Sequence, residues 1–138
     1  VFKELILKMS SNKIIKNSEA IISIEARGFI FGSAISLQAS KPMLVARKPG
    51  KLPGELIQEN YSLEYGMNSL SMQKFALNKF NSFVIVDDLL ATGGTINCVA
   101  NLIRKSGKEV SGALIVIELL ELCGRSKFNF PVESVIAI

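Results

Sequence analysis

The residues with the clearest chemical potential lie at one predicted junction between a strand and a helix. A hydrophobic run ends in two acids, Asp87 and Asp88, and the small residues Ala91–Thr95 then open a helix. The first N–H groups of a helix have no partner within it, and glycines let the backbone approach an anion closely. The junction therefore predicts a phosphate site. Its candidate ligands are Ala91, Thr92, Gly93, Gly94 and Thr95.

The two acids suit a different part of the same ligand. Ionised Asp87 and Asp88 only accept hydrogen bonds, so they fit the vicinal hydroxyls of a ribose and would repel the phosphate. The loop has no lysine after its glycines and no G-x-G-x-x-G, which excludes a nucleoside-triphosphate loop and a dinucleotide fold. A plain helix cap is the alternative, but two acids, threonines and paired glycines exceed what capping requires.

A second strand–turn–helix junction carries the charged residues Glu25 and Arg27, followed by Gly28. Taken alone, the two charges are typical of a surface ion pair, and the glycine of a close contact between helix and strand. The segment 47–60 is a further candidate, because Arg47, Lys48 and Lys51 stand among prolines and glycines with no hydrophobic period. A solvated loop and a lid that closes over an anion both fit this composition.

Elements that could position these residues alternate between strand and helix patterns. Predicted helices cover residues 2–9, 28–39 and 95–105, and predicted strands cover 20–24, 43–46, 83–86 and 112–117. A hairpin is predicted from strands at 61–65 and 70–73, with the turn at 66–69. This alternation predicts an α/β fold, with a largely parallel central sheet and helices on both faces.

Length and composition limit the remaining possibilities. The 138 residues, of 15.0 kDa, suffice for one domain, residues 1–138. The absence of histidine excludes a Ser-His-Asp relay and a His-ligated zinc. Cys98 and Cys123 have no neighbouring ligands, so we interpret both as small buried hydrophobic residues. With no bilayer-length apolar run and no signal peptide, we expect a cytoplasmic protein without a membrane partner.

The net charge of +4 does not indicate nucleic acid, because the N-terminal lysines are scattered and lack interleaved aromatic residues. We therefore expect a solvated face there and no nucleic-acid partner. The lysines in question are Lys3, Lys8, Lys13 and Lys16.

Four segments together resemble the type I phosphoribosyltransferases, and their details resemble the adenine-specific branch. They are E-A-R-G-F at 25–29, R-K-P-G-K-L-P-G at 47–54, Y-S-L-E-Y-G at 61–66 and D-D-L-L-A-T-G-G-T at 87–95. The resemblance implies the type I fold with a flexible hairpin lid. It also implies transfer of the phosphoribosyl group of 5-phosphoribosyl 1-diphosphate to adenine, which yields AMP and diphosphate.

The resemblance also implies a role for each candidate. Residues 91–95 would hold the 5′-phosphate, and Asp87 and Asp88 would bind the ribose hydroxyls. Leu89 would lie against one face of the base. The turn at Glu25, Ala26, Arg27 and Gly28 would receive the diphosphate, with Arg27 beside the base, and Arg47, Lys48 and Lys51 would close over it. Glu64 would be the acid/base near purine N7, and Tyr65 would close over the reaction centre.

In such a mechanism Mg²⁺ arrives mainly on the substrate diphosphate, so no protein metal ligands are expected. The family usually forms homodimers. An enzyme for 6-oxopurines is one alternative, although its lysine near the base has no counterpart around Glu118, and the orotate enzymes carry a lid histidine that this chain lacks. A regulatory protein that senses 5-phosphoribosyl 1-diphosphate without turnover is another alternative.

The family also has an N-terminal hood segment, placed before the helix with which this sequence begins. It supplies much of the recognition of adenine. We therefore expect residues 1–138 to be an N-terminally incomplete core domain that binds the sugar phosphate and recognises adenine weakly.

Overall fold

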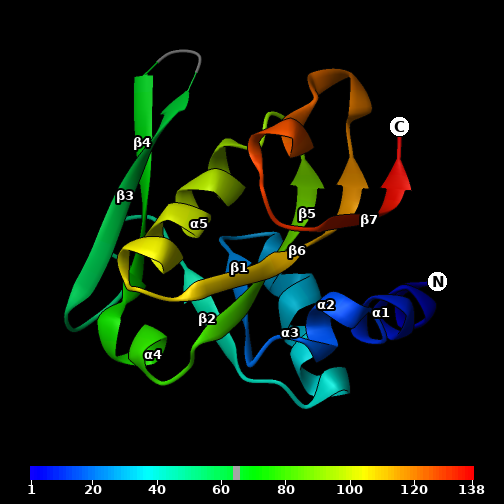
Figure 1. Ribbon diagram of the computed structural model, residues 1–138, viewed down its shortest axis with the longest axis horizontal. Helices are drawn as coiled ribbons and strands as arrows, with labels where there is room; N and C mark the ends of the chain where they lie inside the picture. The colour runs from blue at the N-terminus through cyan, green and yellow to red at the C-terminus, as the bar shows by residue number, and fades with distance from the viewer. Residues whose placement is uncertain (64–65) are drawn as a thin grey trace.

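A computed structural model describes residues 1–63 and 66–138 of the chain (Figure 1). Its main sheet has five strands in the order β2-β1-β5-β6-β7, and every neighbouring pair is parallel. The strands are β1 (Ala20–Ile24), β2 (Met43–Ala46), β5 (Ser82–Leu90), β6 (Glu109–Glu118) and β7 (Val132–Ala137). The two predicted chemical junctions follow β1 and β5, which are neighbours, so both lie at the same edge of the sheet.

The central strands are buried on both faces, which explains their unbroken apolar sequence. Ile22 and Ile85 face one core, while Ile21 and Val84 face the other. Helices α1 (Phe2–Ser10), α2 (Lys13–Lys16) and α3 (Gly28–Ala39) cover one face, and α5 (Gly94–Lys105) covers the opposite face. The predicted α/β class and the parallel sheet are confirmed.

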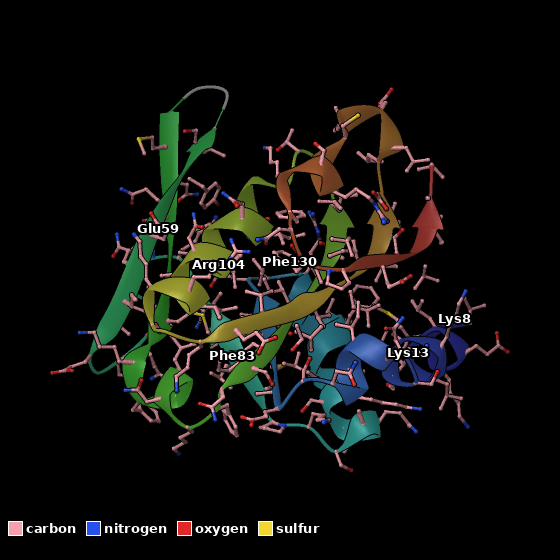
Figure 2. All side chains as sticks on the ribbon, in the orientation of Figure 1. Lys8, Lys13, Glu59, Phe83, Arg104 and Phe130 are labelled. Carbon is pink, nitrogen blue, oxygen red and sulfur yellow. The ribbon has the colours of Figure 1, made fainter. Side chains whose placement is uncertain are left out.

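A two-stranded hairpin, β3 (Leu56–Leu63) and β4 (Gly66–Gln73), packs against α5. The Sγ of Cys98 on α5 donates to the carbonyl oxygen of Glu59 at 3.3 Å, and the side chain of Glu59 pairs with Lys105. Helix α4 (Lys74–Asn78) then connects the hairpin to the sheet. Figure 2 labels Glu59 on the hairpin, next to α5.

Two predictions about the hairpin were wrong. The loop expected over 47–60 ends earlier, because β3 begins at Leu56, and the turn expected at 66–69 belongs to β4, where Gly66 pairs with Leu63. The register of antiparallel strands is set by pairing across the hairpin, and the composition of each strand alone does not reveal it.

Most other local predictions are confirmed, with strands that extend further than their apolar runs. The predictions at 20–24, 28–39 and 43–46 agree with β1, α3 and β2. The turns η1 (Leu120–Leu122) and η2 (Gly124–Lys127), together with α2, α4 and β7, had no sequence prediction. Cys98 is buried as expected, but Cys123 is exposed, which corrects that interpretation.

The N-terminal lysines are exposed, as expected for a solvated face, and Figure 2 shows Lys8 and Lys13 on the outside of α1 and α2. Phe83, also labelled there, is fully buried and meets Phe80 edge to face with ring centroids 6.3 Å apart. Among the described residues, no helix combines the length and apolar character needed to span a membrane.

Candidate active site

A cavity of about 260 Å³ lies at the carboxyl ends of β1 and β5. Three segments line it: residues 24–27 after β1, residues 61–63 of the hairpin, and residues 87–96 across the junction of β5 and α5. Both chemical junctions identified in the sequence therefore open into one space, which the hairpin closes on a third side.

The small-residue loop at the start of α5 has the geometry of an anion site. Gly93 has φ +87°, and a Cβ there would lie 3.0 Å from both the Gly124 carbonyl oxygen and the Phe128 ring. Asn97 N donates to Gly93 O at 2.9 Å, so the preceding N–H groups of the first turn have no acceptor within the helix. They are free to bind a phosphate, and the residues that carry them line the cavity.

The two acids beside the loop occupy different environments. Asp87 is 7% exposed, and its Oδ1 accepts a hydrogen bond from Asp88 N at 2.9 Å. Burial raises the pKa of Asp87 to about 7; the charge of Asp88 adds to this effect, while the Asp88 N–H and the charge of Arg27 oppose it. Asp88 is more accessible and forms an ion pair with Arg27 Nε. The site thus holds one buried acid with a raised pKa and one acid that is paired with an arginine.

The turn after β1 is packed directly on β5. A Cβ on Gly28 would lie 2.9 Å from Asp87 Oδ1 and 3.2 Å from the Val86 carbonyl oxygen, so only glycine allows this approach. The peptide bond between Glu25 and Ala26 is cis. The contact at Gly28 therefore aligns the turn after β1 with Asp87 on the neighbouring strand.

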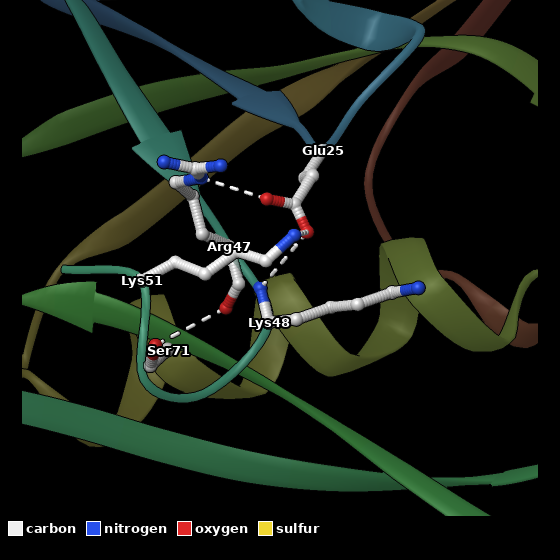
Figure 3. Close-up of polar contacts among 5 residues, drawn as sticks. All are labelled: Glu25, Arg47, Lys48, Lys51 and Ser71. Carbon is white, nitrogen blue, oxygen red and sulfur yellow. Dashed lines mark hydrogen bonds and ion pairs between the residues drawn. The ribbon is translucent and has the colours of Figure 1, made fainter.

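The Glu25 carboxylate gathers the positive groups of the loop that follows β2 (Figure 3). Its Oε1 accepts from Arg47 Nε at 2.7 Å, and its Oε2 accepts from Lys51 Nζ and from Lys48 N, both at 3.4 Å. Arg47 is fixed in turn by backbone hydrogen bonds with Ser71 of β4, at 3.0 and 2.7 Å. Figure 3 shows the Lys48 side chain directed away from Glu25.

These contacts determine the protonation of Glu25. Burial alone would raise its pKa, but hydrogen bonds from Arg47, from Lys48 N and from Lys51 lower it overall. Glu25 is therefore an anion at neutral pH, at the edge of a cavity that is predicted to accept a diphosphate.

Most of the predicted site residues are brought together. Those that line the cavity are Glu25, Ala26, Arg27, Asp87, Asp88, Leu89, Ala91, Thr92, Gly93, Gly94 and Thr95. Gly28 lies behind the cavity, and the side chains of Arg47 and Lys51 reach its edge through Glu25. Glu64 and Tyr65 lie outside the described residues, although Leu63 just before them lines the cavity.

Sequence reasoning missed two contributions. Tyr61 and Ser62 line the cavity, whereas the sequence supplied only their place in a motif. Gly124 and Phe128 pack against Gly93 of the small-residue loop, although they lie more than thirty residues further along the chain. No local pattern marks such a contact, because it depends on how distant segments pack.

A strand that ends in an acidic pair leads into a small-residue loop that opens a helix, and this junction lies at the edge of a parallel sheet. The model of the phosphoribosyl transferase domain family matches residues 2–128, and the chain belongs to this family.

Its relatives identify the branch. The chain is 71% identical over 134 residues to a Prochlorococcus marinus subsp. pastoris protein named adenine phosphoribosyltransferase, covering 97% of this chain and 78% of that protein. The crystal structure of adenine phosphoribosyltransferase from Thermoanaerobacter pseudethanolicus superposes with a TM-score of 0.91 at 38% identity, over 99% of this chain and 80% of that one.

A third comparison includes a ligand complex. The Saccharomyces cerevisiae adenine phosphoribosyltransferase, solved with an imino-altritol bisphosphate and adenine, gives a TM-score of 0.86 at 34% identity, over 96% of this chain and 78% of that one. The resemblance to the adenine-specific branch, stated from four motifs, is confirmed.

Proposed function

We propose that this chain transfers the 5-phosphoribosyl group of 5-phosphoribosyl 1-diphosphate to adenine, forming AMP and releasing diphosphate. The observation that carries the proposal is the cavity that joins the Ala91–Thr95 loop, the acids Asp87 and Asp88, and the Glu25–Arg27 turn. A phosphorylated ribose with a second anionic group at C1 presents the groups that these three segments complement. The names of the relatives support the same reaction.

The sugar phosphate is oriented by two sets of protein groups. The 5′-phosphate accepts hydrogen bonds from the first-turn N–H groups of α5 and from the hydroxyls of Thr92 and Thr95. The ribose hydroxyls donate to Asp87 and Asp88, so the anomeric carbon faces the turn after β1. Fixing both ends of the substrate lowers the entropic part of the barrier.

At the anomeric carbon, a ring nitrogen of adenine forms the new bond while the bond to the diphosphate oxygen breaks. Arg27 and Leu89, which line the cavity, hold the base. Glu64 serves as the acid/base and accepts the proton that purine N7 loses as the new bond forms, and Tyr65 closes over the reaction centre. The diphosphate departs with the electron pair of the broken bond, and no covalent intermediate on the protein is required.

Departure of the diphosphate requires positive charge near the turn. Arg47, Lys48 and Lys51 are carried by a loop whose first residue is fixed to β4. Transfer of Arg47 and Lys51 from Glu25 to the diphosphate would bring their charge onto the leaving group. Each charge-assisted hydrogen bond contributes about 1.5–3 kcal/mol once water is excluded.

Mg²⁺ fits this site as an ion that enters bound to the substrate diphosphate. Among the described residues, no group of three acidic, histidine or cysteine side chains is placed to hold a metal, and Asp88 already pairs with Arg27. Diphosphate oxygens, sugar hydroxyls and water are the expected ligands. When bound, the ion neutralises charge that develops on the leaving diphosphate.

The chain is further proposed to form a homodimer through α3. Ile30 and Leu37 stand seven residues apart on this helix, hence on one side, and are 58% and 85% exposed. Sedimentation equilibrium of an Ile30→Glu/Leu37→Glu double variant should show a monomer, whereas Leu122→Glu, an exposed residue elsewhere, should leave the dimer intact. An unchanged mass for the double variant would contradict this interface.

A cytoplasmic location completes the proposal. Both cysteines are free thiols, as expected in a reducing compartment. Fractionation of cells that express this protein should place it with cytoplasmic markers.

Calorimetric titration tests the reaction. The chain is titrated with 5-phosphoribosyl 1-diphosphate and Mg²⁺, then adenine is added and AMP is followed by chromatography, with hypoxanthine and orotate in parallel. Formation of AMP with adenine, without nucleotide formation from hypoxanthine or orotate, supports the proposal. Preferential turnover of hypoxanthine would replace it with the 6-oxopurine alternative.

The controls use acids of similar type. Asp87→Asn should weaken binding of the sugar phosphate, while Glu133→Gln, an exposed acid on β7, should not. Binding without any product would favour a sensor of 5-phosphoribosyl 1-diphosphate.

A further inference from the structure

A segment distant in sequence supports the phosphate loop from behind. Gly124 is buried, and a Cβ on it would lie 2.3 Å from the Ala91 carbonyl oxygen and 3.2 Å from Gly93 N. In the opposite direction, a Cβ on Gly93 would lie 3.0 Å from the Gly124 carbonyl oxygen. The two backbones are therefore in direct contact, and a displacement of Gly124 would displace the loop.

The position of Gly124 is fixed through the residue that follows it. Arg125 donates from Nε to Glu118 Oε1 at 2.7 Å and from Nη2 to Glu118 Oε2 at 2.5 Å. Its Nη1 donates to the Val132 carbonyl oxygen at 2.9 Å, and Ser134 Oγ donates to Glu118 Oε2 at 2.8 Å. One guanidinium thus ties the η2 turn to the ends of β6 and β7.

Glu118 itself is positioned by the sheet. It lies opposite Leu90 of β5, the last residue before the phosphate loop, and its side chain is only 3% exposed. The hydrogen bonds from Arg125, partly opposed by burial and aided by Ser134, lower its pKa. A buried carboxylate costs desolvation energy, which its partners must offset.

Neither Glu118 nor Arg125 is among the described residues that line the cavity, so neither is placed to touch the substrate. We propose that Arg125 and Glu118 are positioning residues for the 5′-phosphate: by clamping Gly124 against Ala91–Gly93, they hold the loop amides in the geometry that binds the phosphate. This inference rests on the proposed function of that loop.

An electrostatic explanation makes a different prediction for one variant. If Glu118 acted only through its charge, Glu118→Gln would remove a negative group near the loop and strengthen phosphate binding. If Glu118 acts by clamping the turn, the same variant weakens two charge-assisted hydrogen bonds and therefore weakens phosphate binding. The sign of the change separates the two explanations.

The test uses ribose 5-phosphate as the probe, because it carries the phosphate and the ribose but no diphosphate. Its Kd is measured calorimetrically for the unaltered chain and for Glu118→Gln, Arg125→Lys and Arg125→Met, below the thermal transition of each. Lys127→Met, an exposed cation of the same turn, is the matched control for charge. Inorganic diphosphate serves as a second ligand, because its proposed site is the turn after β1, which Arg125 and Glu118 do not position.

We expect Arg125→Met to weaken ribose 5-phosphate binding about tenfold, which is the effect of losing about one charge-assisted hydrogen bond, with Glu118→Gln and Arg125→Lys intermediate. Lys127→Met and the affinity for diphosphate should change less than about twofold, within the scatter of surface substitutions. If Arg125→Met does not fold, the result for Glu118→Gln decides.

Three outcomes would overturn the inference: unchanged affinity in the folded Arg125 variants, tighter binding by Glu118→Gln, or equal loss of both ligands. If the unaltered chain itself fails to bind ribose 5-phosphate, the assignment of the phosphate loop is wrong and the clamp has no function to support. Binding of ribose 5-phosphate by the unaltered chain therefore distinguishes failure of the proposed function from failure of the clamp.

Discussion

Arg47 Nε lies 2.7 Å from Oε1 of Glu25, so the basic loop is tied to the same turn that is proposed to receive the diphosphate. The Glu25 side chain is 5% exposed, whereas those of Arg47 and Lys51 are 33% and 48% exposed. The Glu25 carboxylate pairs with Arg47 and Lys51, the two cations that the leaving diphosphate requires in the proposed mechanism. Substrate binding and release of the loop from Glu25 are therefore coupled in the proposed mechanism.

Glu25→Gln should loosen this loop and strengthen the binding of diphosphate. The variant loses the negative charge that holds Arg47 and Lys51, and it removes repulsion of an anionic ligand. Because the partners are partly exposed, the free energy of unfolding should fall by only about 1 kcal/mol. Urea denaturation, hydrogen exchange of residues 47–55 and calorimetry with inorganic diphosphate measure the three effects.

Glu55→Gln is the matched control for Glu25→Gln, since Glu55 is an exposed acid of the same loop. Weaker diphosphate binding by Glu25→Gln, with Glu55→Gln unchanged, would show that Glu25 supports the ligand directly and does not compete for the cations.

Binding of ribose 5-phosphate should weaken as the pH falls from 8 to 6. The pKa of Asp87 is raised to about 7 by burial, so the free protein loses the ionised acceptor for the ribose hydroxyls across this range. For one group with that pKa the loss is about tenfold. Protonation of the ligand phosphate also makes the binding depend on pH. Asp87→Asn measures this contribution by itself, because the variant lacks the titrating carboxyl group of Asp87. Parallel profiles for the two proteins would refute the role of Asp87.

Asp87→Asn should also stabilise the fold at pH 8. The folded-state pKa of Asp87 lies above its usual value near 3.8, so ionisation costs the folded chain more than the unfolded chain. The penalty grows as the pH rises from about 4 to 7 and is complete above that range. The gain in Tm from Asp87→Asn should therefore be present at pH 8 and vanish near pH 4. A gain that is independent of pH would point to another cause.

Gly32→Ala should destabilise the protein, although alanine is the better helix former. The added Cβ would lie 1.5 Å from Ser23 Oγ and 2.8 Å from Ser23 Cβ, where α3 packs on β1. Overpacking of this kind costs about 1–3 kcal/mol. Removing the hydroxyl in a Ser23→Ala/Gly32→Ala double variant should restore part of the loss in urea denaturation. If the single variant is as stable as the unaltered chain, the contact between α3 and β1 is looser than described.

The sequence by itself determined the features that depend on neighbouring residues. Apolar runs predicted the buried strands β1 and β2, hydrophobic spacing predicted α3, and glycines beside threonines predicted the loop at the start of α5. These signals are local because strand burial, helix periodicity and an open helix terminus each arise within one short segment. The parallel sheet followed from the order of those segments.

Only the tertiary structure decided how distant segments meet. Pairing with β4 set the start of β3, and folding brought Arg47, 22 residues away, into hydrogen-bond contact with Glu25. Burial beneath neighbouring elements raised the pKa of Asp87, and packing of the turn that contains Arg125 brought Gly124 against the loop before α5. Such effects depend on which side chains share a space after folding, and residues far apart along the chain carry no local pattern that records it.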